Sequence, residues 1–100
     1  MIKVPDPSVP PRFYYVYVLL SQKDKGFYVG STLDLKNRIR MHNEEKVNST
    51  KSRAPFELVF YETYRNKYDA IRREDYLKST KGKRTLRNML KEYLSGIDKN

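Results

Sequence analysis

The chain has no cysteine and a single histidine. Disulfides, zinc fingers and thiol nucleophiles are therefore excluded, and so is a metal site built from several histidines. Any bound metal must be a hard cation held by oxygen atoms, such as Mg²⁺ or Mn²⁺. The lack of cysteine also fits a reducing compartment, and we expect a cytoplasmic protein.

Long apolar runs are missing as well. No segment approaches the roughly 20 apolar residues that span a bilayer, and no basic-then-apolar leader starts the chain. Residues 1–11, with four prolines, instead predict a flexible N-terminal arm. A chain of 100 residues allows one domain with one modest core, which we expect over 12–95, followed by a tail over 96–100.

Positive charge is abundant, with a formal net charge of +9. Between Arg65 and Lys91, ten Lys and Arg residues face only three acids. A polyanion is the expected partner, and nucleic acid is the commonest one. A membrane surface is disfavoured, because no helix pairs a strong apolar face with Trp or Phe. A merely solvated basic face is the alternative.

Residue patterns predict six secondary-structure elements. Runs of β-branched and aromatic residues predict strands over 13–20, 27–30 and 56–62. Helical spacing of apolar residues predicts helices over 33–45, 66–80 and 86–94. Ser31 and Thr32 are expected to cap the first helix, and Gly82 to separate the last two. The order β-β-α-β-α-α predicts a small α+β domain with a three-stranded antiparallel sheet flanked by helices.

Glu74 lies where a charge is costly. On its predicted helix it shares a face with Ala70, Ile71 and Leu77, the face that the helix should bury. A carboxylate there must be paired, hydrogen-bonded or bound to a metal. Lys78, one turn along, would make an ion pair. In a very basic protein the same carboxylate would also serve a Mg²⁺-dependent phosphodiesterase, and the helix alone leaves both alternatives open.

Five segments follow one another in the chain: Tyr15-Val16-Tyr17, Tyr28-Val29-Gly30-Ser31-Thr32, the pair Arg38 and His42, the strand over 54–62, and the segment over 69–74. Together they resemble the GIY-YIG nuclease superfamily, and most of all its small stand-alone bacterial members. Arg38 and His42 lie one turn apart and are both expected at the rim of the core. Tyr15 replaces the first Gly of the family name and is expected to be a packing residue.

The resemblance implies a divalent-metal-dependent endonuclease with Tyr17, Tyr28, Arg38, His42 and Glu74 as catalytic residues. Glu74 would hold Mg²⁺ or Mn²⁺, and Arg38 would contact the scissile phosphate. One of the two tyrosines would orient or deprotonate the attacking water, while His42 would share a proton or position the water. A tyrosine acting as base would need nearby cations to lower its pKa from about 10.

The expected partner is DNA, bound by its structure more than by its sequence, in repair or recombination and with a protein partner for targeting. Backbone contacts would come from eight basic residues: Lys51, Arg53, Arg72, Arg73, Lys81, Lys83, Arg84 and Arg87. The alternative is a non-catalytic nucleic-acid-binding module that kept the fold. A purely structural adaptor fits the charge pattern less well.

Overall fold

The computed structural model describes residues 12–97. Its elements in chain order are β1 (Tyr14–Ser21), β2 (Phe27–Thr32), α1 (Leu35–Asn43), the 3-10 turn η1 (Lys51–Arg53), β3 (Phe56–Tyr64), α2 (Lys67–Lys78), α3 (Thr80–Met89) and α4 (Lys91–Ile97). The predicted α+β class and antiparallel sheet are confirmed, with two helices after α2 where one was predicted. The arm predicted over 1–11 and the end of the tail over 98–100 lie outside the described residues.

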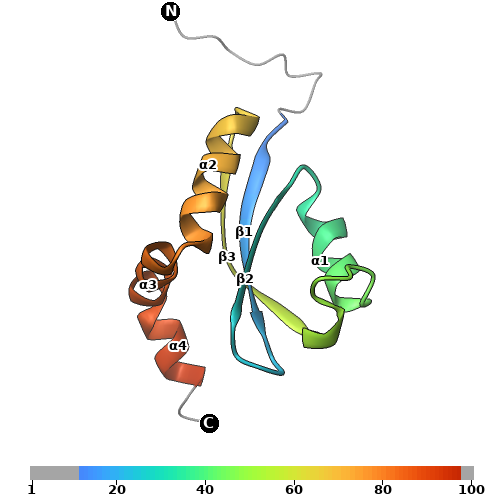
Figure 1. The fold of residues 1–100 in the computed structure, drawn as a ribbon, viewed down its shortest axis with the longest axis vertical. Helices are drawn as coiled ribbons and strands as arrows, with labels where there is room; N and C mark the ends of the chain where they lie inside the picture. Colours follow the sequence, from blue (N-terminus) through green and yellow to red (C-terminus); the bar gives the residue numbers. More distant parts are fainter. Residues whose placement is uncertain (1–11, 98–100) are drawn as a thin grey trace, which may run out of the picture.

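The three strands form one antiparallel sheet in the order β2-β1-β3. Helix α1 covers one face, and α2, α3 and α4 lie on the opposite side (Figure 1). The central strand β1 is therefore shielded on both faces. Within residues 12–97, no helix has the length and apolar character needed to cross a membrane.

The sheet separates two small cores, where the sequence predicted one. On the α2 side, Val16, Val18 and Leu20 pack with residues such as Leu77. On the α1 side, Tyr17 and Leu19 of β1 pack with Phe56, and partly buried residues of α1 and β3 close this core. Side chains of β1 thus alternate between the two cores, and each fully buried large side chain contributes about 1.5–3 kcal/mol.

Helix α1 begins later than predicted. Ser31 and Thr32 belong to β2, because Thr32 pairs with Tyr15 of β1. The cap is instead Asp34, which we expected in the first helical turn. Its carboxylate accepts a hydrogen bond from the Asn37 N–H at 3.1 Å.

The prediction that Gly82 breaks the chain is wrong. The break lies at Ser79, whose side chain caps α3 by accepting a hydrogen bond from the Gly82 N–H at 3.0 Å. A Cβ on residue 82 would overlap the carbonyl oxygen of Tyr76. Glycine therefore lets the first turn of α3 pack against the end of α2, and the next interruption comes at Leu90.

Candidate active site

The candidate site lies along the free edge of β2, between α1 on one face of the sheet and α2 on the other. Alternation along β2 directs Tyr28 toward the α1 side and Ser31 toward α2, where it contacts Glu74. Tyr17 comes from β1, while Arg38 and His42 come from α1. Residues from four elements thus meet around one strand edge.

A buried hydrogen-bonded chain joins Tyr17, His42 and Thr50. The Tyr17 hydroxyl lies 2.9 Å from Nε2 of His42, and Nδ1 of His42 lies 2.8 Å from the Thr50 hydroxyl. The Thr50 hydroxyl in turn donates to the carbonyl oxygen of Val47 at 3.4 Å. We assign the proton to Nδ1 of His42, because Nε2 can then accept the Tyr17 proton and every donor in the chain has an acceptor.

His42 is fully buried, so its predicted place at the rim of the core is wrong. Burial first, and then the positive charge of Arg38, lower the pKa of His42 from 6.5 to about 4. The imidazole is therefore neutral at pH 7 and holds a free lone pair toward the tyrosine.

The Tyr17 hydroxyl is protonated in the resting protein. Burial raises the pKa of Tyr17 to about 12, although hydrogen bonding to Arg38 opposes this rise. The lowered pKa that a tyrosine base would need is thus absent before substrate binds. Since its partner His42 is a neutral acceptor, Tyr17 is arranged to pass a proton on rather than to remain a phenolate.

Gly30 makes room for the Tyr17 ring. The two residues are cross-strand partners in β1 and β2, and a Cβ on residue 30 would lie 2.5 Å from the Tyr17 hydroxyl oxygen. No side chain larger than hydrogen fits there without displacing the phenol. The glycine of the second motif therefore positions the tyrosine of the first.

Tyr28 extends the aromatic cluster outward from the buried chain. Its ring centroid lies 6.3 Å from that of Tyr17 and 4.8 Å from that of His42. Phe56 closes the far side, at 6.5 Å from Tyr28. Tyr28 is half-buried, so one side of its ring faces the open edge of β2.

Arg38 supplies an uncompensated positive charge to this cluster. After burial, its positive charge is the second cause that lowers the pKa of His42, and its hydrogen bond and charge oppose the rise that burial produces in the pKa of Tyr17. Among residues 12–97, the ion pairs of the protein do not include Arg38, whereas Arg40 on the same helix pairs with Glu44 at 2.9 Å. A guanidinium without a carboxylate matches a phosphate group.

Glu74 reaches the site from α2 and makes two strong contacts. Its Oε1 accepts a hydrogen bond from the Ser31 hydroxyl at 2.5 Å, and its Oε2 lies 2.6 Å from Nζ of Lys78. The Glu74 side chain is 16% exposed and that of Lys78 is 50% exposed, so the pair is sheltered on one side only. Its negative charge also raises the pKa of Tyr17 across the edge of β2. Ile71, expected on the same buried face, is exposed instead.

The residues at Glu74 fit a divalent cation with one protein ligand. The described part of the chain has no group of three or more metal-ligating side chains. Mg²⁺ commonly keeps several waters and takes one or two carboxylates plus substrate phosphates. Each carboxylate oxygen has lone pairs beyond its present contact, and the long side chain of Lys78 is free to move its ammonium group away.

Asn43 anchors α1, and with it the site, to the start of β3. Its side-chain oxygen accepts from the Phe56 N–H at 2.6 Å, and its nitrogen donates to the Phe56 carbonyl at 3.2 Å. Sequence reasoning missed Asn43, Thr50 and the contact of Ser31 with Glu74. Only Ser31 carried a usable signal, since strand alternation places it on the α2 side.

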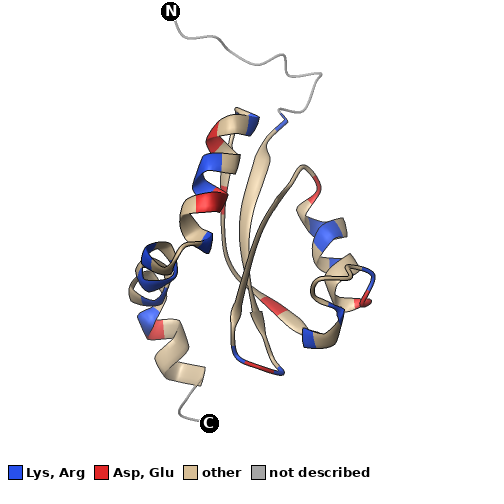
Figure 2. Ribbon diagram, in the orientation of Figure 1, with Lys and Arg blue, Asp and Glu red and all other residues tan. Residues whose placement is uncertain are grey.

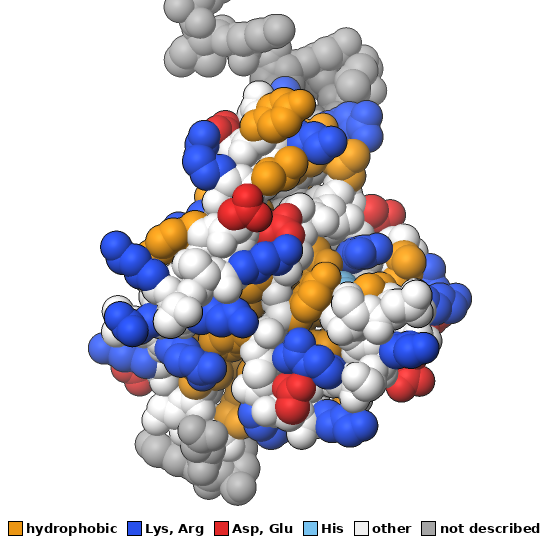
Figure 3. Space-filling view, viewed as in Figure 1, with side chains coloured by type: hydrophobic (Ala, Val, Ile, Leu, Met, Phe, Trp, Pro, Cys, Tyr) orange, Lys and Arg blue, Asp and Glu red, His pale blue; other side chains and the backbone are white. Residues whose placement is uncertain are grey.

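The eight predicted backbone-contact residues fall into two groups. Three arginines are held by neighbouring acids: Arg53 by Asp24, Arg72 by Asp69 and Arg73 by Glu62. The others make no ion pair within residues 12–97; they are Lys51 on η1 and Lys81, Lys83, Arg84 and Arg87 on α3. Lys and Arg dominate α3 (Figure 2). Lys and Arg side chains from the whole described chain lie on both sides of the face shown in Figure 3, with hydrophobic side chains between them.

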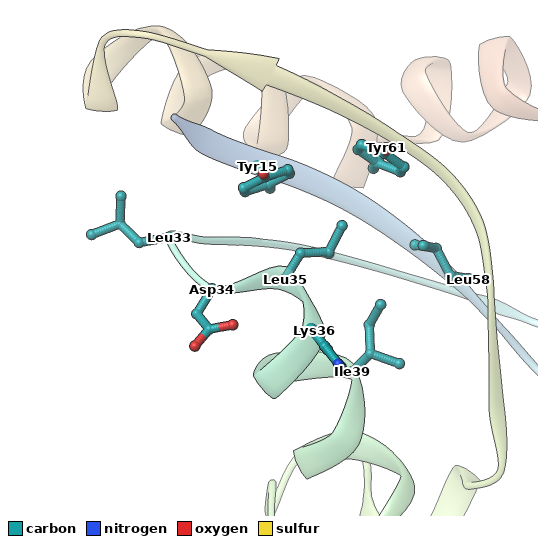
Figure 4. A pocket seen from close by; sticks show the side chains of 8 residues that line it. All are labelled: Tyr15, Leu33, Asp34, Leu35, Lys36, Ile39, Leu58 and Tyr61. Carbon is teal, nitrogen blue, oxygen red and sulfur yellow. The ribbon is translucent and has the colours of Figure 1, made fainter. Parts of the chain in front are cut away.

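A separate apolar pocket lies between α1 and the β1–β3 side of the sheet (Figure 4). Leu35 and Ile39 point from α1 toward the sheet, and the rings of Tyr15 and Tyr61 lie 5.9 Å apart above them. None of the five predicted catalytic residues lines this pocket. Tyr15 therefore lines this pocket, where its ring packs against that of Tyr61.

Comparisons with known proteins agree with this arrangement. The family model described as the GIY-YIG catalytic domain matches residues 13–88. The UPF0213 protein YazA of Bacillus subtilis is 40% identical over 68 residues, which cover 67% of this chain and 66% of that protein. A UPF0213 protein of Clostridium perfringens is 42% identical over 65 residues, which cover 64% of this chain and 69% of that protein.

The fold has a similar solved structure as well. The solution NMR structure of a UPF0213 protein from Bacillus halodurans has 34% sequence identity and a TM-score of 0.50, and the match covers 77% of this chain and 84% of that one. A catalytic domain of this kind implies nuclease-type chemistry. With most of its residues matched by the family model, the chain belongs to the GIY-YIG family.

Proposed function

We propose that this protein is a divalent-metal-dependent endonuclease that hydrolyses phosphodiester bonds in DNA. The observation that carries the proposal is the contact of Tyr17 with Nε2 of the neutral His42, together with the guanidinium of Arg38, which has no acidic partner within residues 12–97. Hydrolysis needs an acceptor for the water proton and a positive group for the phosphate. The Tyr17–His42 pair would accept the proton and Arg38 would supply the positive group. These groups belong to the site at the β2 edge, which Glu74 borders.

In the proposed reaction, a water molecule attacks the phosphorus while the Tyr17 oxygen takes one of its protons. The phenolic proton of Tyr17 moves at the same time to Nε2 of His42, which becomes an imidazolium ion. Arg38 pairs with the phosphate oxygens, and Tyr28 orients the water. The bond from phosphorus to the leaving oxygen breaks as the new one forms, a divalent ion on Glu74 would supply positive charge to that oxygen, and the oxygen then takes a proton from water. Because His42 is buried, its Nε2 proton returns to the Tyr17 hydroxyl as the phenol passes its own proton to water.

We propose recognition of DNA structure rather than sequence, in repair or recombination within the cytoplasm, with targeting by a protein partner. Support comes from the cations on η1 and α3 that make no ion pair in the described part of the chain, since phosphate contacts position nucleic acid without reading its bases. Lys51, Lys83 and Arg84 are exposed and would track the backbone toward the β2 edge.

A second candidate, a non-catalytic nucleic-acid-binding module, is favoured by one observation. Glu74 is already satisfied by Lys78 and Ser31, so the carboxylate has a structural role without any metal. A binding module would need the basic surface alone and would tolerate loss of the tyrosine–histidine chain.

A cleavage assay separates the two candidates. Branched, nicked and single-stranded DNA, with RNA as a further arm, are incubated with Mg²⁺, Mn²⁺ or EDTA. We expect metal-dependent cleavage that Glu74→Gln lowers by at least about 100-fold, because an amide replaces the charged ligand. DNA binding should change little. Glu92→Gln on α4 is the matched control. Equal cleavage by Glu74→Gln would remove the nuclease assignment, and binding without cleavage by the unaltered protein would favour the binding module.

A further inference from the structure

Lys78 holds the carboxylate that the proposed metal needs. Its Nζ lies 2.6 Å from Oε2 of Glu74, while Ser31 holds Oε1. Glu74 and Lys78 are one helical turn apart on α2, so the helix backbone keeps their side chains close to each other. An ammonium group thus stands beside the same carboxylate that a divalent cation would use.

The two cations cannot share this carboxylate at low cost. A Mg²⁺ ion binds carboxylate oxygen at about 2.0–2.1 Å, so an ammonium group still at 2.6 Å from Oε2 would lie only a few ångströms from it. Like charges at such a distance repel strongly, especially where the carboxylate is largely screened from water. Metal binding therefore requires Lys78 to leave.

The site offers Lys78 a second partner. Because Glu74 contacts both Ser31 of β2 and Lys78, the ammonium group lies near the β2 edge, which also carries Tyr28. Half of the Lys78 side chain is exposed, so it can turn toward this edge without unpacking the core. A DNA phosphate bound there by Arg38 would accept it.

We infer that Lys78 is an exchangeable counter-ion, which occupies Glu74 in the free protein and transfers to a DNA phosphate when the metal binds. This inference rests on the proposed function and adds to it a coupling between metal binding and DNA binding. Because phosphate gives Lys78 a new partner, DNA should strengthen metal binding, and metal should strengthen DNA binding by the same factor. The protein would then hold its metal firmly only when substrate is present.

Binding of Mn²⁺ tests this inference without any cleavage measurement. The free Mn²⁺ concentration is followed by electron paramagnetic resonance at constant ionic strength, with and without a phosphorothioate oligonucleotide. For the unaltered protein we expect DNA to raise Mn²⁺ affinity about 10-fold, within the usual range of coupling between sites. Lys78→Met should bind Mn²⁺ about 10-fold more tightly without DNA and should lose most of the DNA effect.

Three controls keep the outcome specific. Lys67→Met removes the same charge from the first turn of α2 and should leave Mn²⁺ affinity nearly unchanged. Lys78→Arg keeps a competing cation and should bind Mn²⁺ weakly without DNA. Glu74→Gln should abolish Mn²⁺ binding in the presence and absence of DNA. Helical circular dichroism checks that each variant is folded.

Different results would contradict the counter-ion role of Lys78 and the binding of a metal by Glu74. Equal Mn²⁺ affinity of Lys78→Met and the unaltered protein would overturn the counter-ion role and leave the metal on Glu74 standing. Equal gains from Lys67→Met and Lys78→Met would reduce the effect to net charge and would also overturn it. If no variant binds Mn²⁺, with or without DNA, the metal-dependent function falls together with this inference.

Discussion

The Tyr17 hydroxyl lies 2.9 Å from Nε2 of His42, and neither side chain is more than 1% exposed. Because the two residues form one proton path, we expect Tyr17→Phe and His42→Gln each to lower the cleavage rate by about 10²–10⁴. The double variant should lose no more than the worse single variant. Single-turnover cleavage rates test this, and losses that multiply would mean that the residues act separately.

The burial of His42 predicts how the stability of the protein depends on pH. The folded-state pKa of His42 is about 4, below its ordinary value of 6.5. As pH falls from 6.5 to 4, the unfolded chain takes up this proton before the native protein does, so unfolding becomes easier. We expect a loss of about 1–3 kcal/mol over this range. Urea unfolding at a series of pH values measures it, and His42→Gln should flatten the curve there.

Gly30 should be required for the position of the Tyr17 phenol. In Gly30→Ala the new Cβ would lie 2.5 Å from the Tyr17 hydroxyl oxygen. We expect the variant to lose about 1–3 kcal/mol of stability through overpacking and most of its cleavage activity. Gly96→Ala is the control, because within residues 12–97 its Cβ would meet nothing within 4 Å beyond its own helix backbone and chain neighbours, and alanine favours the helix. Undiminished cleavage by Gly30→Ala would show that the phenol can move without cost.

Two arginines on α1 allow a matched comparison of charge removal. Arg38 has no acidic partner within residues 12–97, whereas Arg40 pairs with Glu44 on the helix surface. Arg38→Ala should lower kcat/KM by about 100-fold or more, since a charged contact to the reacting phosphate is lost. Arg40→Ala should stay within a few-fold of the unaltered protein. Similar losses for both would assign Arg38 to general electrostatic attraction.

The exposed cations of α3 should govern the salt dependence of DNA binding. Each phosphate contact contributes about 0.9 to the slope of log affinity against log salt for duplex DNA. Lys83→Ala with Arg84→Ala should therefore reduce this slope by about 2, with a similar effect on all sequences. Lys46→Ala is a suitable control, because Lys46 is paired with Glu44 at 3.0 Å. Fluorescence anisotropy over a salt series gives both slopes, and an unchanged slope would place the DNA elsewhere.

The strands and their faces were predictable from the sequence because local alternation determines them. Tyr17 and Leu19 point to one side and Val16 and Val18 to the other, as a period of two requires. The pairing of Glu74 with Lys78 was predictable for the same reason, since residues four apart are neighbours on any helix.

Features that depend on distant segments could not be predicted in this way. His42 is buried because a loop brings Thr50 over it, and no local pattern reveals that contact. Gly82 resembles a helix breaker by composition, yet its missing side chain serves the packing of α3 against α2. In both cases tertiary contacts outweighed local propensity.

The alternation of β2 limits how sequences of this kind can change in length. Tyr28 and Ser31 serve opposite helices because they lie three positions apart, and an odd offset along a strand places two side chains on opposite faces. A single inserted or deleted residue between them would place both side chains on the same face, so that either the acid would lose its hydroxyl partner or the imidazole would lose its aromatic neighbour. The turn over 22–26 lies outside this segment, so length variation in homologous proteins should be common there and absent inside the strand.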